Sequence, residues 1–447
     1  MNLINTIFKG DKVVWMIFLM LCLISITEVF SASSTLTYGT QGHWGPITRH
    51  TMFLLGGAAF VVLLHNIPYK WFRALPILLI PLSVVFLLML LFFDNLNIGG
   101  VFVIEKTNDA GRWIKLMGVP FQPSEFAKMA IIILTASILS KGQTEEEANP
   151  NAFKWIMGST ALICLLIMPE NYSTAFLLFG TVYLMMIIGR VNTRKVVLLG
   201  GTLLSAGIIV VLSLLVTTDS TLEKIPMGHR LTTVKHRIEN FAKGEKVPAA
   251  KYDIQGDGAQ VGHARIAIAS SNILGKGPGN SVERDFLSQA YSDFIFAIVI
   301  EELGLIGGFF VVFLYICLLI RAGRIAQKCD KTFPAFLVLG VALLLVVQAT
   351  FNMGVAVGIF PVTGQPLPLI SRGGTSTIVN CIYIGMILSV SRYTAGLEEA
   401  ALANAELVEM KTEDGEGGEE QNDSFVSEAQ TAIEPTAVIL NEDSELK

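Results

Sequence analysis

Long apolar runs are the feature that most constrains how this chain can fold. The run VVWMIFLMLCLISITEVF (13–30) is typical: as a helix it can cross about 30 Å of hydrocarbon, and similar runs recur along most of the sequence. Of the 447 residues, 52% are hydrophobic and only 15% are charged, whereas a soluble domain carries about 25% charged residues. The sequence therefore predicts an all-α polytopic membrane protein.

The apolar runs predict about ten transmembrane helices within one domain, residues 1–396. We place the helices at 13–30, 51–67, 75–93, 124–140, 155–168, 172–189, 196–216, 292–320, 333–353 and 374–392. The loop at 217–291, between the seventh and eighth helices, is far longer than the others. Loops of this length are uncommon unless they have a function.

Lysine and arginine counts predict the orientation of the helices. With the N-terminus inside, the inside segments carry fourteen basic residues and the short outside segments carry five. Cytoplasmic loops are enriched in Lys and Arg, so we expect both termini in the cytoplasm. The 217–291 loop then lies outside the membrane, on the periplasmic side.

The C-terminal segment has a different composition. Residues 397–447 contain fifteen acidic residues against two lysines, a balance of −13, and few large apolar groups. Such a segment cannot bury enough apolar surface to fold alone. We expect a disordered, acidic cytoplasmic tail that is solubilising or binds a partner.

Several outward-facing helix ends carry charged residues, which is unusual for membrane-spanning helices. The stretch NDAGRWIKLMGVPFQPSEFAKMA (108–130) enters the fourth helix carrying Arg112, Lys115, Glu125 and Lys128. Glu125 and Lys128 are three residues apart and share a helix face. They are either a structural ion pair or part of a polar cavity, because ionisable residues within spans usually face a cavity or pathway.

The approach to the eighth helix contains a second set of charges. Lys276 lies in the glycine-rich turn GKGPG, Asp293 lies near the helix start, and Glu301 and Glu302 lie roughly 12–14 Å deeper at 1.5 Å per residue. Asp293 could be a helix N-cap. The two glutamates project about 100° apart, so we expect them not to share one environment and at least one to pair with a base or be protonated.

The segment before the tenth helix, FNMGVAVGIFPVTGQPLPLISRGGTS (351–376), is broken by proline and glycine. Irregular backbone near membrane depth is tolerated where protein buries it or where it lines a wet cavity. Ser371, Arg372, Gly373 and Gly374 then lead into the helix, whose free N–H groups suit an anion. Three separate segments thus bring cations and carboxylates to the outer side, and they predict an anionic ligand reached from the outer leaflet.

These residues resemble the SEDS family (shape, elongation, division and sporulation proteins). The matching segments, in the family's order, are GRWIKLMGVPFQPSEFAK, LGKGPG followed by SDFIFAIVIEELG, and NMGVAVGIFPVTGQPLPLISRGGTS. With the ten-helix layout, the resemblance covers residues 10–393. The N-terminal stretch and the QPSE and LPLIS forms are more similar to the division branch than to the closely related elongation branch.

The resemblance implies a peptidoglycan glycosyltransferase of the bacterial cytoplasmic membrane, at the division septum. Such enzymes polymerise lipid II, an undecaprenyl-pyrophosphate-linked disaccharide pentapeptide, into glycan strands on the periplasmic face. The implied partners are a class B penicillin-binding protein, which is the transpeptidase, other division proteins and membrane lipids, with no nucleic acid. Asp293 matches the family's essential aspartate, and Arg112 and Lys128 match its basic cavity positions.

The sequence departs from the family pattern in three places, one of them a pair of residues. Arg372 stands where the family commonly has a tyrosine, Glu283–Arg284 replaces a common Gln–Lys pair, and Glu170 stands where an aspartate is usual. Arg372 adds a positive charge, which suits a pyrophosphate ligand.

The residues suggest a mechanism. Asp293 is either the general base for the acceptor sugar hydroxyl or the ligand of a divalent cation (Mg or Mn) that activates it. Arg112, Lys128 and Lys276 would stabilise the departing pyrophosphate. The alternatives are a lipid II flippase, which uses similar intramembrane charges, a non-catalytic scaffold of the division machinery, and the elongation-branch polymerase.

Overall fold

The structure is a computed structural model. It describes residues 8–32, 45–93, 95–100, 102–105, 113–116, 119–143, 148–218, 221, 231–236, 238–239, 259–287 and 290–413. The Arg112 prediction therefore lies outside the described residues.

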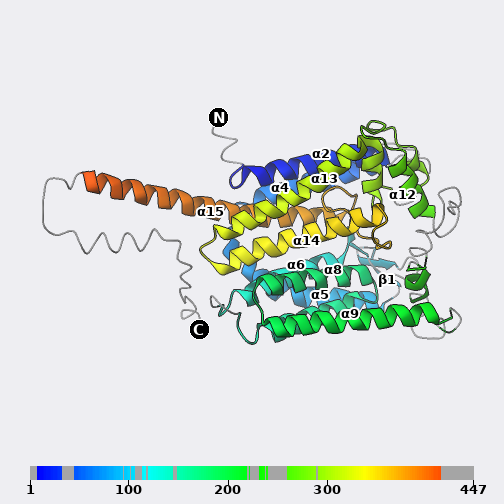
Figure 1. The fold of residues 1–447 in the computed structure, drawn as a ribbon, viewed down its shortest axis with the longest axis horizontal. Coiled ribbons are helices and arrows are strands. Elements are labelled where there is room, and N and C mark those ends of the chain that lie inside the picture. The colour runs from blue at the N-terminus through cyan, green and yellow to red at the C-terminus, as the bar shows by residue number, and fades with distance from the viewer. Residues whose placement is uncertain are drawn as a thin grey trace.

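A helix lies at each of the ten predicted positions, and together the helices form an elongated bundle (Figure 1). Their bounds are α2 Lys12–Ala32, α4 Gly45–Leu64, α5 Leu75–Phe92, α6 Pro123–Leu139, α7 Ala152–Ile167, α8 Tyr172–Ile188, α9 Thr193–Val216, α13 Ile295–Gln327, α14 Thr332–Ala356 and α15 Thr375–Glu413. Short elements connect them: the 3-10 helices η1 Tyr69–Ala74 and η3 Glu283–Asp285, and helix α12 Ala259–Ala269.

Seven helical segments of the described chain are long and apolar enough to cross a membrane. They comprise α2, α4, η1 with α5, α9, α13, α14 and α15. Helices α6, α7 and α8 have only 16 or 17 residues, which gives them a length of about 25 Å. These seven segments indicate a multi-pass helical membrane protein, whereas ten membrane crossings remain a prediction.

The centre of the bundle is formed by α14 and α15. About 72% of the apolar window of each is buried, against 6% for α9, which lies at the edge of the bundle (Figure 1). The side chains of α6 also face inward: twelve of the fourteen residues from Pro123 to Ala136 are buried, and Glu125 and Lys128 are among them. Charged residues of α6 are therefore held inside the protein rather than against lipid.

The all-α prediction is wrong in the segment between α5 and α6. Four short strands form an antiparallel sheet in the order β1-β2-β3-β4, with bounds Asn95–Ile98, Phe102–Glu105, Ile114–Leu116 and Val119–Phe121. The first hairpin turns at Gly99 and Gly100, whose φ angles are 59° and 72°. Ile98 pairs with Phe102, so the loop has three residues, and glycine adopts positive φ without the steric cost that a side chain imposes.

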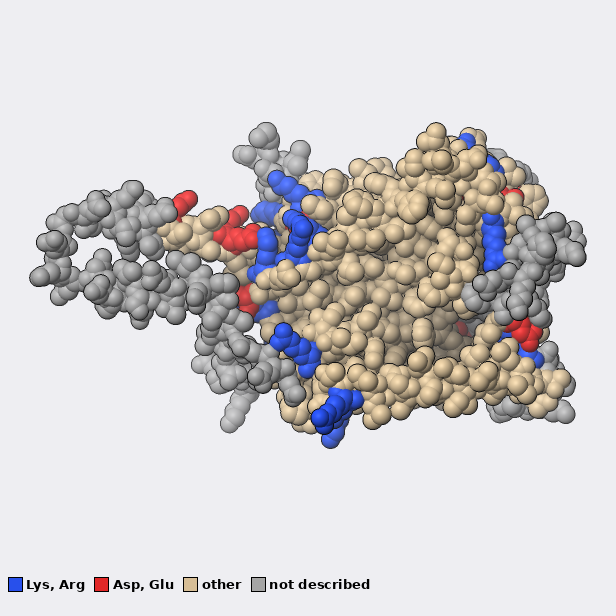
Figure 2. All heavy atoms as spheres, viewed as in Figure 1, with Lys and Arg blue, Asp and Glu red and all other residues tan. Residues whose placement is uncertain are grey.

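The two ends of the bundle differ in charge. Figure 2 shows Lys and Arg side chains gathered at the end from which α15 projects, over the starts and ends of several helices. The N-termini of α6 and α13 and the sheet lie at the opposite end (Figure 1). Helix α15 continues to Glu413, so the boundary expected at residue 397 falls inside a helix, and the tail prediction for 414–447 lies outside the described residues.

Candidate active site

The loop before α15 holds the segment that contains Asp293. The hydroxyl of Ser371 donates to the carbonyl of Ser292 (2.7 Å) and accepts from the backbone N–H of Leu367 (2.7 Å). The backbone N–H of Arg372 donates to the carbonyl of Tyr291 (2.9 Å). These contacts fix the backbone on the N-terminal side of Asp293 against the 367–372 loop.

Asp293 is half-buried and lies just before α13. Phe294 is the residue at the N-cap position, so Asp293 precedes the cap, and its Oδ1 accepts a hydrogen bond from the Ser292 hydroxyl (2.8 Å). The Asp293 carboxylate therefore does not cap α13.

Two amides on α14 connect this loop to the interior. The side-chain amide of Asn352 donates to the carbonyls of Asp293 (2.9 Å) and Gln365 (2.7 Å). One turn earlier, the amide of Gln348 donates to the carbonyl of Pro366 (3.0 Å), and its Oε1 accepts from Lys128 Nζ (3.0 Å). Asn352 and Gln348 were not identified from the sequence. The sequence signal that could have identified them is an amide side chain within an apolar span, because a buried amide needs a hydrogen-bond partner.

Glu125 and Lys128 form the ion pair that their spacing suggested. Glu125 Oε1 lies 2.8 Å from Lys128 Nζ, and both side chains are almost completely buried. Because Lys128 also donates to Gln348, the pair is part of the network that reaches Asp293 rather than an isolated structural pair. The other carboxylate oxygen, Glu125 Oε2, is buried without a hydrogen-bond partner among the described residues.

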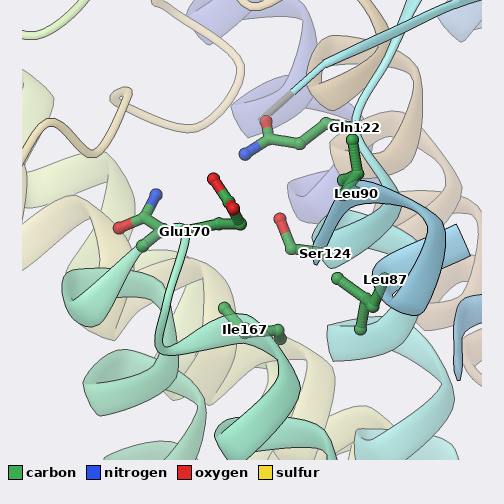
Figure 3. Close-up of a pocket in the computed structure, with 7 residues that line it drawn as sticks. Leu87, Leu90, Gln122, Ser124, Ile167 and Glu170 are labelled. Carbon is green, nitrogen blue, oxygen red and sulfur yellow. The ribbon is translucent and has the colours of Figure 1, made fainter. Parts of the chain in front are cut away.

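A narrow crevice opens beside the start of α6 (Figure 3). Gln122 and Ser124 face Glu170 across it (Figure 3), and Asn171, Leu87, Leu90 and Ile167 complete the lining. Its volume of about 10 Å³ has room for about one water molecule. Glu170, one of the departures from the family pattern, therefore lies near the helix that carries Lys128.

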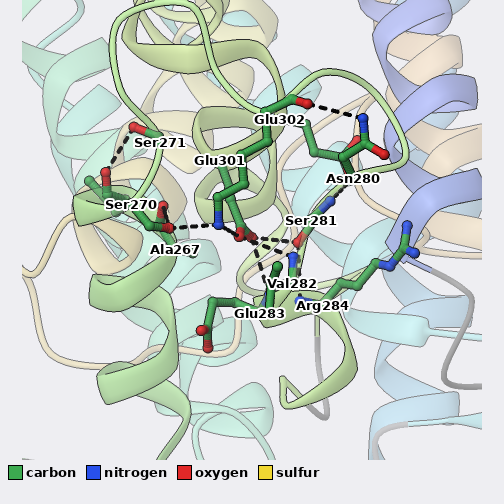
Figure 4. A network of polar contacts seen from close by, with 12 residues as sticks. Ala267, Ser270, Ser271, Asn280, Ser281, Val282, Glu283, Arg284, Glu301 and Glu302 are labelled. Atoms are coloured by element: carbon green, nitrogen blue, oxygen red, sulfur yellow. Dashed lines mark hydrogen bonds and ion pairs between the residues drawn. The ribbon is translucent and has the colours of Figure 1, made fainter.

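Lys276, Glu301 and Glu302 belong to a second network, shown in Figure 4. Lys276 Nζ lies 2.6 Å from Glu301 Oε1 and donates to the Ser270 hydroxyl (2.9 Å). Glu301 also accepts from the backbone N–H of Val282 (3.1 Å) and from the Ser281 hydroxyl. The ammonium of Lys276 is thus engaged by a fully buried carboxylate, and the described contacts do not join it to Asp293.

Glu302 anchors the other side of the same loop. Its carboxylate accepts from the backbone N–H groups of Gly279 (2.8 Å) and Ser281 (3.1 Å), and from the hydroxyl of Ser31 on α2. Arg284 donates to the same hydroxyl (2.8 Å). The expectation that the two glutamates occupy separate environments is wrong, because the 276–284 loop wraps over the helix and reaches both.

A break in α13 makes this arrangement possible. Gly304 has φ 73° and ψ −177°, which interrupts the helical hydrogen bonds. The N–H groups of Leu305 and Ile306 donate to the 272–273 backbone, and the carbonyls of Glu301 and Glu302 accept from Lys276 (3.0 Å) and Gly277 (2.8 Å). The 272–277 loop therefore replaces one turn of helix hydrogen bonds.

Of the remaining predicted residues, Arg372, Gly373 and Gly374 lie in or next to the loop that contacts the first network. The guanidinium of Arg372 lies 5.3 Å from the ring centre of Tyr291. Burial lowers the pKa of Arg372 from its usual value, as does the nearby Arg49, while Tyr291 opposes the shift. Gly374 has φ 57° next to the first residue of α15, and the Gly373 carbonyl accepts from Ser376. Lys115 is exposed on β3.

The fold and this buried polar network define a helical integral membrane protein with an ionisable site at one end of its bundle. Comparison with known proteins identifies its family. The sequence model of the FtsW/RodA/SpoVE family, described as cell cycle protein, matches residues 11–396. The chain belongs to this family.

Relatives and solved structures agree with this assignment. A protein of Trichlorobacter lovleyi named probable peptidoglycan glycosyltransferase FtsW is 30% identical over 88% of this chain and 95% of its own length. The Bacillus subtilis protein of the same name is 28% identical over 84% of this chain and 88% of its own.

Among solved structures, a chain of a peptidoglycan synthase complex that coordinates polymerization and crosslinking aligns with a TM-score of 0.62 and 23% identity, covering 86% of this chain and 98% of that one. The rod shape determining protein RodA of Thermus thermophilus aligns with a TM-score of 0.54 and 20% identity, covering 86% and 97%. These two likenesses show a common fold.

Proposed function

We propose that this protein is a peptidoglycan glycosyltransferase of the division branch, which polymerises lipid II at the outer face of the bacterial cytoplasmic membrane during septal cell-wall synthesis. The names of its relatives support the activity. The observation that carries the proposal is the continuous network from Asp293 through Asn352, the 365–366 backbone and Gln348 to Lys128. It fixes the backbone of Asp293 and the ammonium of Lys128 at one end of the bundle.

The reaction assigns a task to each end of this network. A sugar hydroxyl of the acceptor attacks the anomeric carbon of the donor, a new glycosidic bond forms, and the bond to undecaprenyl pyrophosphate breaks. Asp293 takes the hydroxyl proton as general base, a role that contributes about 10²–10⁴-fold in enzymes. Lys128 and Arg372, with Arg112, stabilise the negative charge that develops on the pyrophosphate.

A divalent cation such as Mg²⁺ or Mn²⁺ is compatible with this site. The described residues include no group of three or more His, Cys, Asp or Glu side chains placed to hold a metal. However, Mg²⁺ often binds through one or two carboxylates together with substrate phosphate oxygens. Asp293 would then be a ligand of the ion, and the ion would supply the activation of the acceptor hydroxyl that Asp293 otherwise provides as general base.

The charge distribution supports a topology for the proposed enzyme. Residues 1–396 form a ten-span domain, the basic end of the bundle faces the cytoplasm with both termini, and the 217–291 loop and Asp293 face the periplasm. Cytoplasmic ends are enriched in Lys and Arg, and Figure 2 shows that enrichment at the end from which α15 leaves. Residues 397–447 extend into the cytoplasm.

The proposed partner is a class B penicillin-binding protein that cross-links the new strands, with other division proteins around it. A solved synthase complex that coordinates polymerization and crosslinking contains a chain of the same fold. We expect this protein to polymerise lipid II faster in complex with its own partner than alone.

A polymerisation assay tests this function. Purified protein with its transpeptidase partner is supplied with lipid II in detergent, with and without a chelator. Asp293→Asn should lower the rate at least about 100-fold, and Asp285→Asn, which alters an exposed carboxylate of the same region, should leave it unchanged. Undiminished polymerisation by Asp293→Asn would remove this residue from the chemistry. Wild-type protein that produces no polymer, yet moves lipid II across vesicles, would favour the flippase.

A further inference from the structure

A cavity of about 350 Å³ lies at the basic end of the bundle, opposite the end that holds the proposed active site. Its walls come from the corner between α4 and η1 and from the middle of α15. Lys70 and Arg392 supply two cations, and His65, Tyr69 and Tyr393 supply aromatic surface. The proposed function does not use any of these residues.

The polar groups of this cavity are suited to an anion. Lys70 is exposed, and the described contacts give its ammonium no carboxylate partner. His65 is 1% exposed and its Nε2 atom is buried, so this ring lines the cavity as aromatic surface and not as a donor to the ligand. Arg392 donates to the carbonyl and side chain of Asn66 (3.3 and 3.1 Å), which fixes one wall and keeps its charge at the cavity.

The surroundings of the cavity are apolar and exposed. Ile67, which lines it, is 37% exposed, and Leu63, Trp71, Ile77 and Leu78 nearby are 62% to 78% exposed. Exposed tryptophan beside lysine is typical of the boundary between membrane and water. A ligand here would meet cations at one end and a hydrocarbon-facing surface at the other, so it should itself be anionic and apolar.

We propose that this cavity binds the phosphate headgroup of an anionic phospholipid of the inner leaflet, whose acyl chains lie along the exposed apolar side chains of α4 and α5. Basic pockets between transmembrane helices on the cytoplasmic side are suited to such headgroups. The adjoining apolar surface favours a lipid over a soluble phosphate and over the acidic C-terminal segment of this chain. The proposal does not depend on the glycosyltransferase activity, but its inner-leaflet placement rests on the membrane orientation proposed above.

Lipid binding to the full chain tests the site. Detergent-purified, delipidated protein is titrated with phosphatidylglycerol and with phosphatidylcholine of the same acyl chains, and bound lipid is counted by native mass spectrometry. Phosphatidylglycerol should bind more tightly. Lys70→Gln should weaken it about fivefold, the effect of about 1 kcal/mol for one basic residue, while the control Lys154→Gln, at an exposed lysine on α7, should not.

Four results would overturn the proposal. The first is equal binding of the two lipids, and the second is unchanged phosphatidylglycerol binding by Lys70→Gln. The third is lipid binding that occurs only after residues 414–447 are deleted. In that case the acidic segment, and not a lipid, would be the occupant of the cavity in the full chain. Glycerol 3-phosphate serves as the soluble competitor: failure to displace the lipid at equal concentration supports a lipid site, and full displacement contradicts it.

Discussion

At the scale of single residues, the Glu125–Lys128 pair is the buried interaction on which the network depends most. Removal of one partner from a buried ion pair costs about 3–5 kcal/mol, since it leaves an uncompensated charge. Lys128→Met should therefore lower the free energy of unfolding by this amount and abolish polymerisation. Thermal unfolding in detergent measures the first effect, and lipid II turnover measures the second.

The double variant Glu125→Gln/Lys128→Met separates stability from function. It removes both charges, so the stability should return toward that of the wild type, while polymerisation should stay lost because the cation is missing. A double variant with normal turnover would mean that Lys128 acts only as the structural partner of Glu125.

The charged residues of this site could be predicted from the sequence because a charge inside an apolar run is conspicuous. Asp293, Glu125 and Lys128 were selected for that reason, and they are joined by one network. Gln348 and Asn352 were missed because uncharged amides do not interrupt the apolar run 333–353. Their role depends on the carbonyls of the 365–366 loop, whose position no local pattern specifies.

At the scale of elements, the break in α13 is the feature that positions the 272–284 loop. A Cβ atom at Gly304 would lie 2.2 Å from the Ile273 carbonyl, and its φ is 73°. Gly304→Ala should destabilise the protein by at least about 2 kcal/mol, from backbone strain together with the clash. The melting temperature should fall accordingly, and amides of residues 276–284 should exchange faster with deuterium.

Gly323→Ala is the matched control in the same helix. A Cβ there has no neighbour within 4 Å, and alanine has a helix propensity about 1 kcal/mol better than glycine. This variant should melt at the wild-type temperature or slightly above it. Equal melting of the two variants would show that the break is not a required feature.

The helices were predictable because an apolar run of about 20 residues has few other stable conformations in a membrane. The break at Gly304 was not, because glycine is frequent within transmembrane helices and ELGLIGGF contains three. The four strands were missed because each has only three or four residues, too few for an alternating pattern to be distinguished from a loop.

At the scale of the whole molecule, the orientation of the bundle decides which substrate Asp293 can meet. If the basic end is cytoplasmic, a fluorescent protein fused after residue 447 should fold and fluoresce, and alkaline phosphatase inserted between residues 240 and 258 should be active. The reverse pattern in intact cells would place Asp293 at the cytoplasmic face and exclude polymerisation outside the membrane.

The central claim is that Asp293 acts in the chemical step rather than in holding the lipid. The most direct measurement compares lipid II binding and lipid II polymerisation by the same purified Asp293→Asn protein. The account predicts a dissociation constant within about threefold of the wild type and a polymerisation rate at least about 100-fold lower. Polymerisation at the wild-type rate, or a loss of rate fully explained by lost binding, would contradict it.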